Sequence, residues 1–111
     1  MIGKLNEIEE KALKEFKEIL VKRFGEKVRT VRLFGSKVKG GFRRESDIDL
    51  LVLMKEVALD EKDWIIDASF DLLLKYNVLI SPIVIAEKRY QNLLRLQTAF
   101  VRNVAREGID L

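Results

Sequence analysis

Between Phe34 and Asp49 the chain reads FGSKVKGGFRRESDID. A glycine-serine pair stands near the start of this stretch and two aspartates close it. The preceding segment, Val28–Phe34, is β-branched and aromatic and predicts a strand that ends at Gly35. The following segment, Ile48–Leu53, is almost continuously apolar and predicts a central strand that is buried on both faces of a sheet. The stretch therefore predicts a polar connection between two strands.

The start of this connection has the residues of a phosphate-binding turn. Gly35 allows a tight exit from the strand and lets a phosphate approach the backbone closely. The Ser36 hydroxyl and the amides after it, if they open a helical turn, supply hydrogen-bond donors. Arg43 and Arg44 are candidates for contacting phosphate from the same loop, although solvated loop positions explain these two arginines at least as well.

The end of the connection has the residues of a metal site. Asp47 and Asp49 stand two positions apart at the start of a predicted strand, so their carboxylates project from one face and can converge on one hard cation, Mg²⁺ or Mn²⁺. Negative charge at the start of a buried strand is costly unless a metal or donors compensate it. Each element alone is commonly an ordinary turn or helix cap, so the weight rests on their combination.

The remaining sequence predicts helices and one further strand. Apolar residues recur every three or four positions in Asn6–Phe24 and Asp60–Tyr76, which predicts two amphipathic helices. A third strand is predicted over Val78–Ile85, and Pro82 within it indicates an edge strand or a bulge. One long helix or two shorter ones are predicted over Glu87–Arg106.

These elements follow the order αββαβα. They predict an α/β (α+β) fold in which helices pack against a mixed sheet of three or slightly more strands. A chain of 111 residues with 48% apolar residues can bury one core, so we expect a single domain over residues 1–111.

The composition excludes several kinds of chemistry. The chain has no cysteine and no histidine, so catalysis would depend on carboxylates, hydroxyls and cations. No apolar run approaches the length of a secretory or membrane segment, so we expect a cytoplasmic protein that does not bind membranes.

Positive charge is concentrated between Lys22 and Arg44, where nine lysines and arginines accompany one acid, Glu26. Such a segment attracts the phosphates of a nucleotide or a nucleic acid, and a solvated basic face is an equally good interpretation of the charge alone. Direct nucleic-acid binding ranks lowest among the functions considered, because the acidic pair interrupts the basic segment.

The spacing of a Gly-Ser pair, ten residues and Asp-x-Asp, with a strand on each side, resembles the signature of the DNA polymerase beta-like nucleotidyltransferase superfamily. The similarity is greatest to the minimal nucleotidyltransferases of prokaryotes and covers nearly the whole chain. It implies a palm-like fold and transfer of a nucleoside monophosphate from a nucleoside triphosphate, by analogy ATP, to a hydroxyl. Gly35 and Ser36 would hold the triphosphate, and Asp47 and Asp49 would ligate Mg²⁺ or Mn²⁺.

The chain departs from this pattern at one position. Fully active members of the superfamily carry a third carboxylate on the next strand, where it completes the metal site. The corresponding residue here is Ser81, and no acid lies between Val78 and Ile85 to replace it. Two carboxylates with a triphosphate can still bind one Mg²⁺. Nucleotide binding is therefore expected to tolerate this loss better than catalysis does.

By resemblance, stand-alone domains of this size are often antitoxins paired with a HEPN-domain ribonuclease, which some of them adenylylate. This gives the leading hypothesis, a nucleotidyltransferase that acts on a HEPN partner. The alternative is a catalytically weakened module of the same fold that acts by binding that partner. The oligomeric state, a homo-oligomer included, stays open.

A second charged feature follows the aspartate pair. Asp60, Asp63, Asp67 and Asp71 share a narrow stripe of the predicted second helix. A solvated face is the first interpretation, a partner-binding surface the second and a metal site the third. The bulky residues of the helix are expected mainly on the other side: Ile65, Phe70, Leu72 and Leu73. Trp64 would either anchor a partner or cap the core.

Overall fold

The computed structural model describes residues 5–35 and 47–111. The predicted sites Ser36, Arg43 and Arg44 therefore lie outside the described residues. In chain order the elements are α1 (Glu7–Phe24), a 3₁₀ turn η1 (Gly25–Lys27), β1 (Val28–Phe34), β2 (Ile48–Met54), α3 (Leu59–Tyr76), β3 (Ile80–Ala86), α4 (Glu87–Leu96), α5 (Ala99–Glu107) and β4 (Ile109–Asp110). The predicted helices and strands are confirmed, with two helices in the last segment, and η1 and β4 are additional.

Local signals set the ends of α1. The Asn6 side chain accepts a hydrogen bond from the Glu9 amide, and the Glu9 carboxylate accepts one from the Asn6 amide, so the helix starts with a capping box. It stops at Gly25, whose φ of 57° is open to glycine at low cost. The sequence therefore fixes both ends of this helix without help from the rest of the fold.

The four strands form one mixed sheet in the order β3-β2-β1-β4. β1 runs antiparallel to β2 and to β4, and β2 runs parallel to β3. β3 is an edge strand, as Pro82 within it predicted. β2 is an inner strand, in agreement with its continuous apolar sequence.

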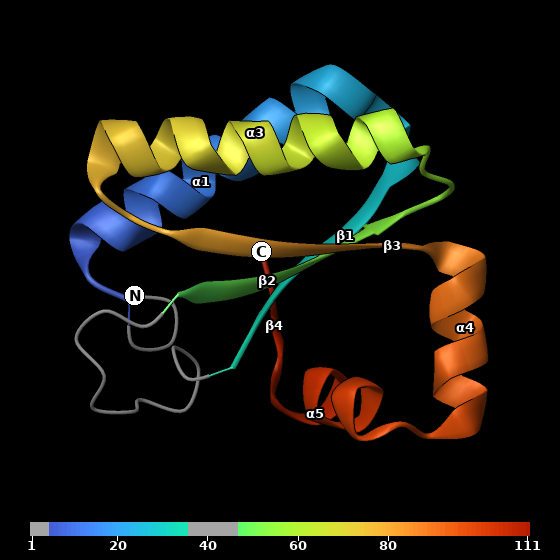
Figure 1. The fold of residues 1–111 in the computed structure, drawn as a ribbon. Helices are drawn as coiled ribbons and strands as arrows, with labels where there is room; N and C mark the ends of the chain where they lie inside the picture. Colours follow the sequence, from blue (N-terminus) through green and yellow to red (C-terminus); the bar gives the residue numbers. More distant parts are fainter. Residues whose placement is uncertain (1–4, 36–46) are drawn as a thin grey trace.

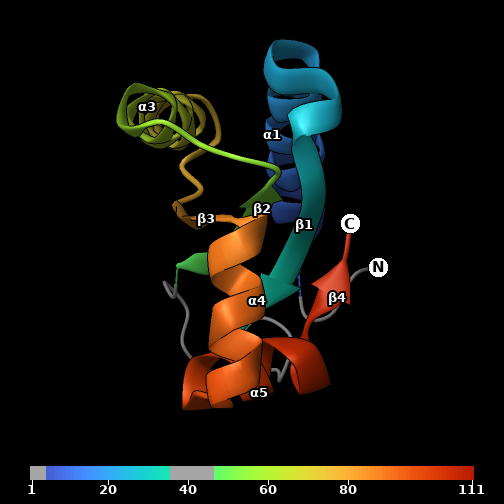
Figure 2. The ribbon, with the colours of Figure 1, turned by 90° about the vertical axis from the view of Figure 1, so that its right-hand side faces the viewer.

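Helices cover both faces of this sheet (Figures 1 and 2). Alternate residues of β2 point to opposite faces: Leu50 and Val52 belong to the main core with α1 and α3, and Leu51 belongs to a smaller core with α4 and α5. Asp49 shares the parity of Leu51 and therefore lies on the α4 and α5 face. This alternation decides on which side of the sheet the candidate site opens.

One expectation about α3 is wrong. Phe70 was expected on the buried side of the helix, but 52% of its surface is exposed. Ile65 and Leu72 are buried as expected. The reason is geometric, because α3 packs on α1 and the sheet over a narrow stripe, and Phe70 lies beyond its edge.

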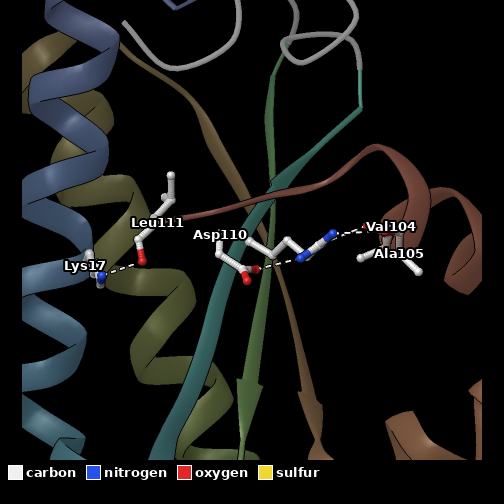
Figure 3. A network of polar contacts seen from close by, with 6 residues as sticks. Lys17, Val104, Ala105, Asp110 and Leu111 are labelled. Carbon is white, nitrogen blue, oxygen red and sulfur yellow. Dashed lines mark hydrogen bonds and ion pairs between the residues drawn. The ribbon is translucent and has the colours of Figure 1, made fainter.

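Arg32 of β1 ties the end of the chain to the sheet (Figure 3). Its guanidinium donates hydrogen bonds of 2.8 Å and 3.0 Å to the carbonyls of Val104 and Ala105 in the last turn of α5, and a 2.7 Å bond to the Asp110 carboxylate. The carbonyls at a helix C-terminus have no partner within the helix, and a cation there is favourable. Arg32 therefore caps α5 and fixes β4 beside β1.

Replacing Arg32 by alanine is expected to reduce the free energy of unfolding by about 2 kcal/mol, because it removes three hydrogen bonds, and of the two carbonyls only that of Val104 keeps a second donor, the Gly108 amide. Urea unfolding measures this loss. Arg29→Ala is the matched control, since the Arg29 pair with Glu87 is 3.4 Å long and exposed, and should cost less than about 0.5 kcal/mol. Equal losses for the two variants would contradict the capping role of Arg32.

Candidate functional site

The register of the sheet places three residues of the site region side by side. Asp49 of β2 pairs with Phe34 across the antiparallel ladder and with Ser81 across the parallel ladder. All three lie on the sheet face that carries α4 and α5. Ser81, which sequence comparison placed where a third carboxylate is expected, thus lies directly beside Asp49.

Asp47 comes just before β2 and joins this group through Ser81. The Ser81 hydroxyl donates a 2.8 Å hydrogen bond to Oδ2 of Asp47. Asp47 is exposed, whereas Asp49 and Ser81 are half-buried. The structure therefore brings both predicted aspartates and the serine to one end of the sheet, with the serine holding one carboxylate in place.

The electrostatics of the pair are unfavourable for negative charge. Burial raises the pKa of the Asp49 carboxyl above its ordinary value, and repulsion from Asp47 raises it further. Within residues 5–35 and 47–111, no cation forms an ion pair with either aspartate. The Ser81 hydroxyl donates its hydrogen bond to Asp47. The site thus carries carboxylate charge that a bound cation would neutralise.

Gly35 at the end of β1 packs against Asp49. Its φ is 84°, in the region that favours glycine, and a Cβ built on it would overlap the Asp49 carboxylate, with Cγ only 3.1 Å away. The sequence predicts a glycine here that lets a phosphate approach the backbone. The structure adds a second requirement, since any side chain would displace the carboxylate that the site depends on.

Replacing Gly35 by alanine is expected to destabilise the fold by about 1–2 kcal/mol through its backbone angle, and also to abolish binding of Mg²⁺ and nucleotide by moving Asp49. Thermal unfolding with and without Mg²⁺ and ATP measures both effects. Gly25→Ala is the matched control, because Gly25 also has a positive φ but nothing lies within 4 Å of its added Cβ. That control should lose stability and keep the ligand response; loss of the response in both variants would refute the contact argument.

An aromatic pair lies next to the site, and the sequence did not predict it. Phe34 lies beside Asp49, and its ring meets that of Phe100 from α5 edge to face, with centroids 5.6 Å apart. Both rings pack against the smaller core on the sheet face that carries Asp49. Phe34 ends a predicted strand and Phe100 lies in a predicted helix, and only the fold brings them together.

The structure divides the basic segment that was expected to attract phosphates. Arg23 lies over the Trp64 ring, Lys27 pairs with Glu61, and Arg29 and Arg32 are bound as described above. β1 runs about 20 Å from Val28 to Phe34, so Lys27 and Arg29 lie at the end of the strand away from Asp49. These cations serve the fold, and any phosphate contact from Arg43 or Arg44 stays a prediction.

Trp64 caps the core. Its ring meets Phe24 edge to face at 5.4 Å, Arg23 covers it, and it packs half-buried against the main core. Of the two roles considered for Trp64, partner anchor and core cap, the structure supports the core cap.

The described part of the chain contains no helix that is both long and apolar enough for a membrane span.

The residues present fit a hard divalent cation. Two carboxylates supply the oxygen ligands that Mg²⁺ prefers, and one of them is already desolvated. Among the residues that the structure describes, no three or more acidic, histidine or cysteine side chains are grouped so that they could hold a metal ion. A cation here would therefore have Asp47 and Asp49 as its protein ligands, with nucleotide oxygens or water completing its coordination.

Comparison with known proteins agrees with this geometry. Residues 13–110 match the family described as the nucleotidyltransferase domain. The chain belongs to the nucleotidyltransferase domain family. Among its relatives are two proteins of Methanocaldococcus jannaschii, each named "putative protein adenylyltransferase". One is 39% identical over 90% of this chain and 94% of its own length, and the other is 36% identical over 89% and 94%.

Solved structures share the fold of this nucleotidyltransferase. A toxin-antitoxin complex with AMP-PNP contains a chain that matches with a TM-score of 0.56 and 20% identity, over 87% of this chain and 70% of the other. A mutant of the toxin-antitoxin pair MntA-HpeT matches with a TM-score of 0.58 and 20% identity, over 96% and 72%. At this identity the two matches establish the fold, and the four-stranded mixed sheet with its helices agrees with the predicted palm-like architecture.

Proposed function

We propose that this nucleotidyltransferase moves AMP from ATP to a hydroxyl group of a protein partner, with Mg²⁺ at Asp47 and Asp49. The observation that carries the proposal is the packed group of Gly35, Asp49, Asp47 and Ser81, in which carboxylate charge is gathered without a cation from the described chain. The relatives named as protein adenylyltransferases support nucleotidyl transfer, and the AMP-PNP complex of a structural neighbour supports an adenine nucleotide.

The chemistry requires positioning more than acid or base groups. The acceptor oxygen forms a bond to the α-phosphorus of ATP, the bond from that phosphorus to pyrophosphate breaks, and the hydroxyl proton passes to solvent. Mg²⁺, when bound, neutralises phosphate charge. Gly35 leaves space for the Asp49 carboxylate, Asp47 and Asp49 would hold the Mg²⁺ that neutralises the phosphates, and the Ser81 hydroxyl holds Asp47 in place.

We further propose that the protein acts as the antitoxin of a toxin-antitoxin pair and that its partner is a HEPN-domain protein. The toxin-antitoxin complexes among the structural neighbours support this setting. A second candidate function is a binding module of the same fold that neutralises the partner without nucleotide transfer. Ser81 favours this second candidate, because a hydroxyl stands where a third ligand would complete the metal site.

Label transfer separates the two functions. The purified protein is incubated with ATP labelled on the α-phosphate, Mg²⁺ and the protein encoded by the neighbouring gene. Label that appears on the partner and is absent with Asp47→Ala supports the transferase. A tight complex without label on the partner supports the binding module and would refute the transferase.

A further inference from the structure

The exposed side of α3 carries an apolar stripe that nothing in the described chain covers. Leu59, Ile66, Phe70 and Leu74 follow one another at steps of seven, four and four positions, which return to one side of a helix. Their exposed fractions are 76%, 41%, 52% and 86%. Figure 2 shows α3 nearly end-on at the periphery of the molecule, with α1 beside it. The helix therefore presents a second apolar side in addition to the one that it buries.

Acidic residues accompany this stripe along its whole length. Asp60, Asp63, Asp67 and Asp71 are exposed, and none of them forms an ion pair in the described residues. Elsewhere the acids of this region are used: Glu61 binds Lys27 and the Ala58 amide, and Glu15 binds Lys75. We call the four apolar and four acidic residues the α3 surface. Its chemistry is apolar with a net negative border.

The C-terminal end of α3 is joined by a short link to β3, which carries Ser81 of the candidate site. α3 ends at Tyr76, and Ser81 follows five residues later, so the helix end lies at most about 17 Å from the Ser81 backbone. The amide of Ile48, between the two aspartates, donates a 2.9 Å hydrogen bond to the carbonyl of Leu79 in this link. Since α3 lies on the sheet face opposite to that of Asp49, a protein bound along α3 would reach the site with a segment that passes around the end of the sheet or the edge strand β3.

We propose that the α3 surface is the docking site for an amphipathic helix of the acceptor protein, with leucine-like residues facing the apolar stripe and lysine or arginine facing the aspartates. The proposal rests on the proposed function, because it assigns the surface that brings a protein acceptor to the nucleotide. Charge complementarity selects this occupant, since a row of exposed carboxylates along one side of the apolar stripe favours a cationic partner and disfavours an acidic one.

A second copy of this chain is the competing occupant. The charged residues of the α3 surface are all aspartates, so two α3 surfaces facing each other across a two-fold axis would bring like charges together. A basic helix from another protein meets no such repulsion. We therefore expect the protein alone to remain free of association through α3.

Calorimetric titration of the full chain with the partner from the label-transfer experiment tests this assignment. Phe70→Ser combined with Leu74→Ser is expected to raise the Kd by at least about 30-fold, because it removes apolar anchors from the contact. Asp67→Lys combined with Asp71→Lys is expected to raise the Kd by about tenfold at low salt and by less at high salt. Circular dichroism checks that these exposed substitutions leave the fold intact.

The matched control removes apolar side chains of similar exposure from α1. Ile8 and Val21 are 55% and 46% exposed, and Ile8→Ser combined with Val21→Ser should change the Kd by less than about twofold. An unchanged Kd in the Phe70 and Leu74 variant, or no binding by the wild-type chain, would overturn the proposal. So would light scattering that shows a homodimer lost in that variant.

The failure of the proposed function has a different signature. Thermal unfolding measures how much Mg²⁺ and ATP stabilise the chain. This stabilisation reports ligand binding at the nucleotide site and does not involve α3. Loss of partner binding with a normal ligand response identifies the docking surface. Normal partner binding without label transfer leaves the docking surface supported and refutes the transferase.

Discussion

Replacing Asp49 by asparagine is expected to lower nucleotidyl transfer by at least about 100-fold while making the ligand-free protein more stable. The loss follows because the amide cannot serve as an anionic metal ligand beside Asp47. The gain in stability follows because burial and the Asp47 charge make the ionised carboxylate unfavourable in the folded protein. Radiolabel transfer and thermal unfolding without Mg²⁺ measure the two effects.

The pH dependence gives the sign of this stability effect. The folded-state pKa of Asp49 is raised, so the folded protein holds the proton more tightly than the unfolded chain. Protonated Asp49 therefore stabilises the folded protein. This stabilisation is complete below the pKa that Asp49 has in the unfolded chain, and it is lost as the pH rises through the folded-state pKa. The advantage of Asp49→Asn over the wild type should therefore be larger at pH 8 than at pH 4.

Glu26→Gln is the control for this substitution, because Glu26 is exposed in η1 at the end of β1 away from Asp49, outside the α3 surface, and the substitution removes the same charge. It should leave transfer and the pH dependence of stability unchanged. An Asp49→Asn protein that is less stable than the wild type at pH 8 would show that the carboxylate has a compensating partner. Full transfer by that variant would remove Asp49 from the metal site.

Replacing Ser81 by aspartate is expected to strengthen Mg²⁺ binding and to increase nucleotidyl transfer by about tenfold or more. Ser81 pairs with Asp49 in the sheet and already reaches Asp47, so a carboxylate at this position would face both aspartates. Three gathered carboxylates repel one another, and the variant should be less stable than the wild type without metal. Added Mg²⁺ should restore its stability.

Ser81→Ala separates the two roles of this position. It removes the 2.8 Å hydrogen bond to Asp47 without adding a ligand, and a loss of transfer of about tenfold or less is expected. Titration of each variant with Mg²⁺, followed by thermal unfolding, gives the metal affinity. Equal metal affinities for Ser81→Asp and the wild type would place the missing carboxylate elsewhere in the fold.

Much of the fold follows from patterns that are local in the sequence. The capping box at Asn6 and the glycine at position 25 set the ends of α1, and the continuous apolar run of β2 indicates an inner strand. Pro82 indicates the edge position of β3. The short strand β4 escaped prediction because two residues carry no strand pattern of their own, and they pair with a strand that lies more than 70 residues earlier in the chain.

Part of the candidate site is also predictable, because some of its residues lie close together in the sequence. The aspartate pair and Gly35 occur in one stretch of sequence, where spacing alone shows that the two carboxylates share a face. The contacts of Asp49 with Gly35, Phe34 and Ser81 depend on register between strands, which no local pattern gives. The ion pairs of Arg29 and Arg32 could not be predicted from local patterns either, because their partners lie more than 50 residues away in the chain.

The sequence by itself determined the family, the order of the elements and the two aspartates, because these depend on residue type and on short spacings. Only the tertiary structure decided that Ser81 holds Asp47, that Phe34 pairs with Asp49 and packs on Phe100, and that α3 has an exposed apolar side. The physical reason is that burial and charge interactions depend on neighbours in space. Strand register and helix packing, which are set by the whole chain, choose those neighbours.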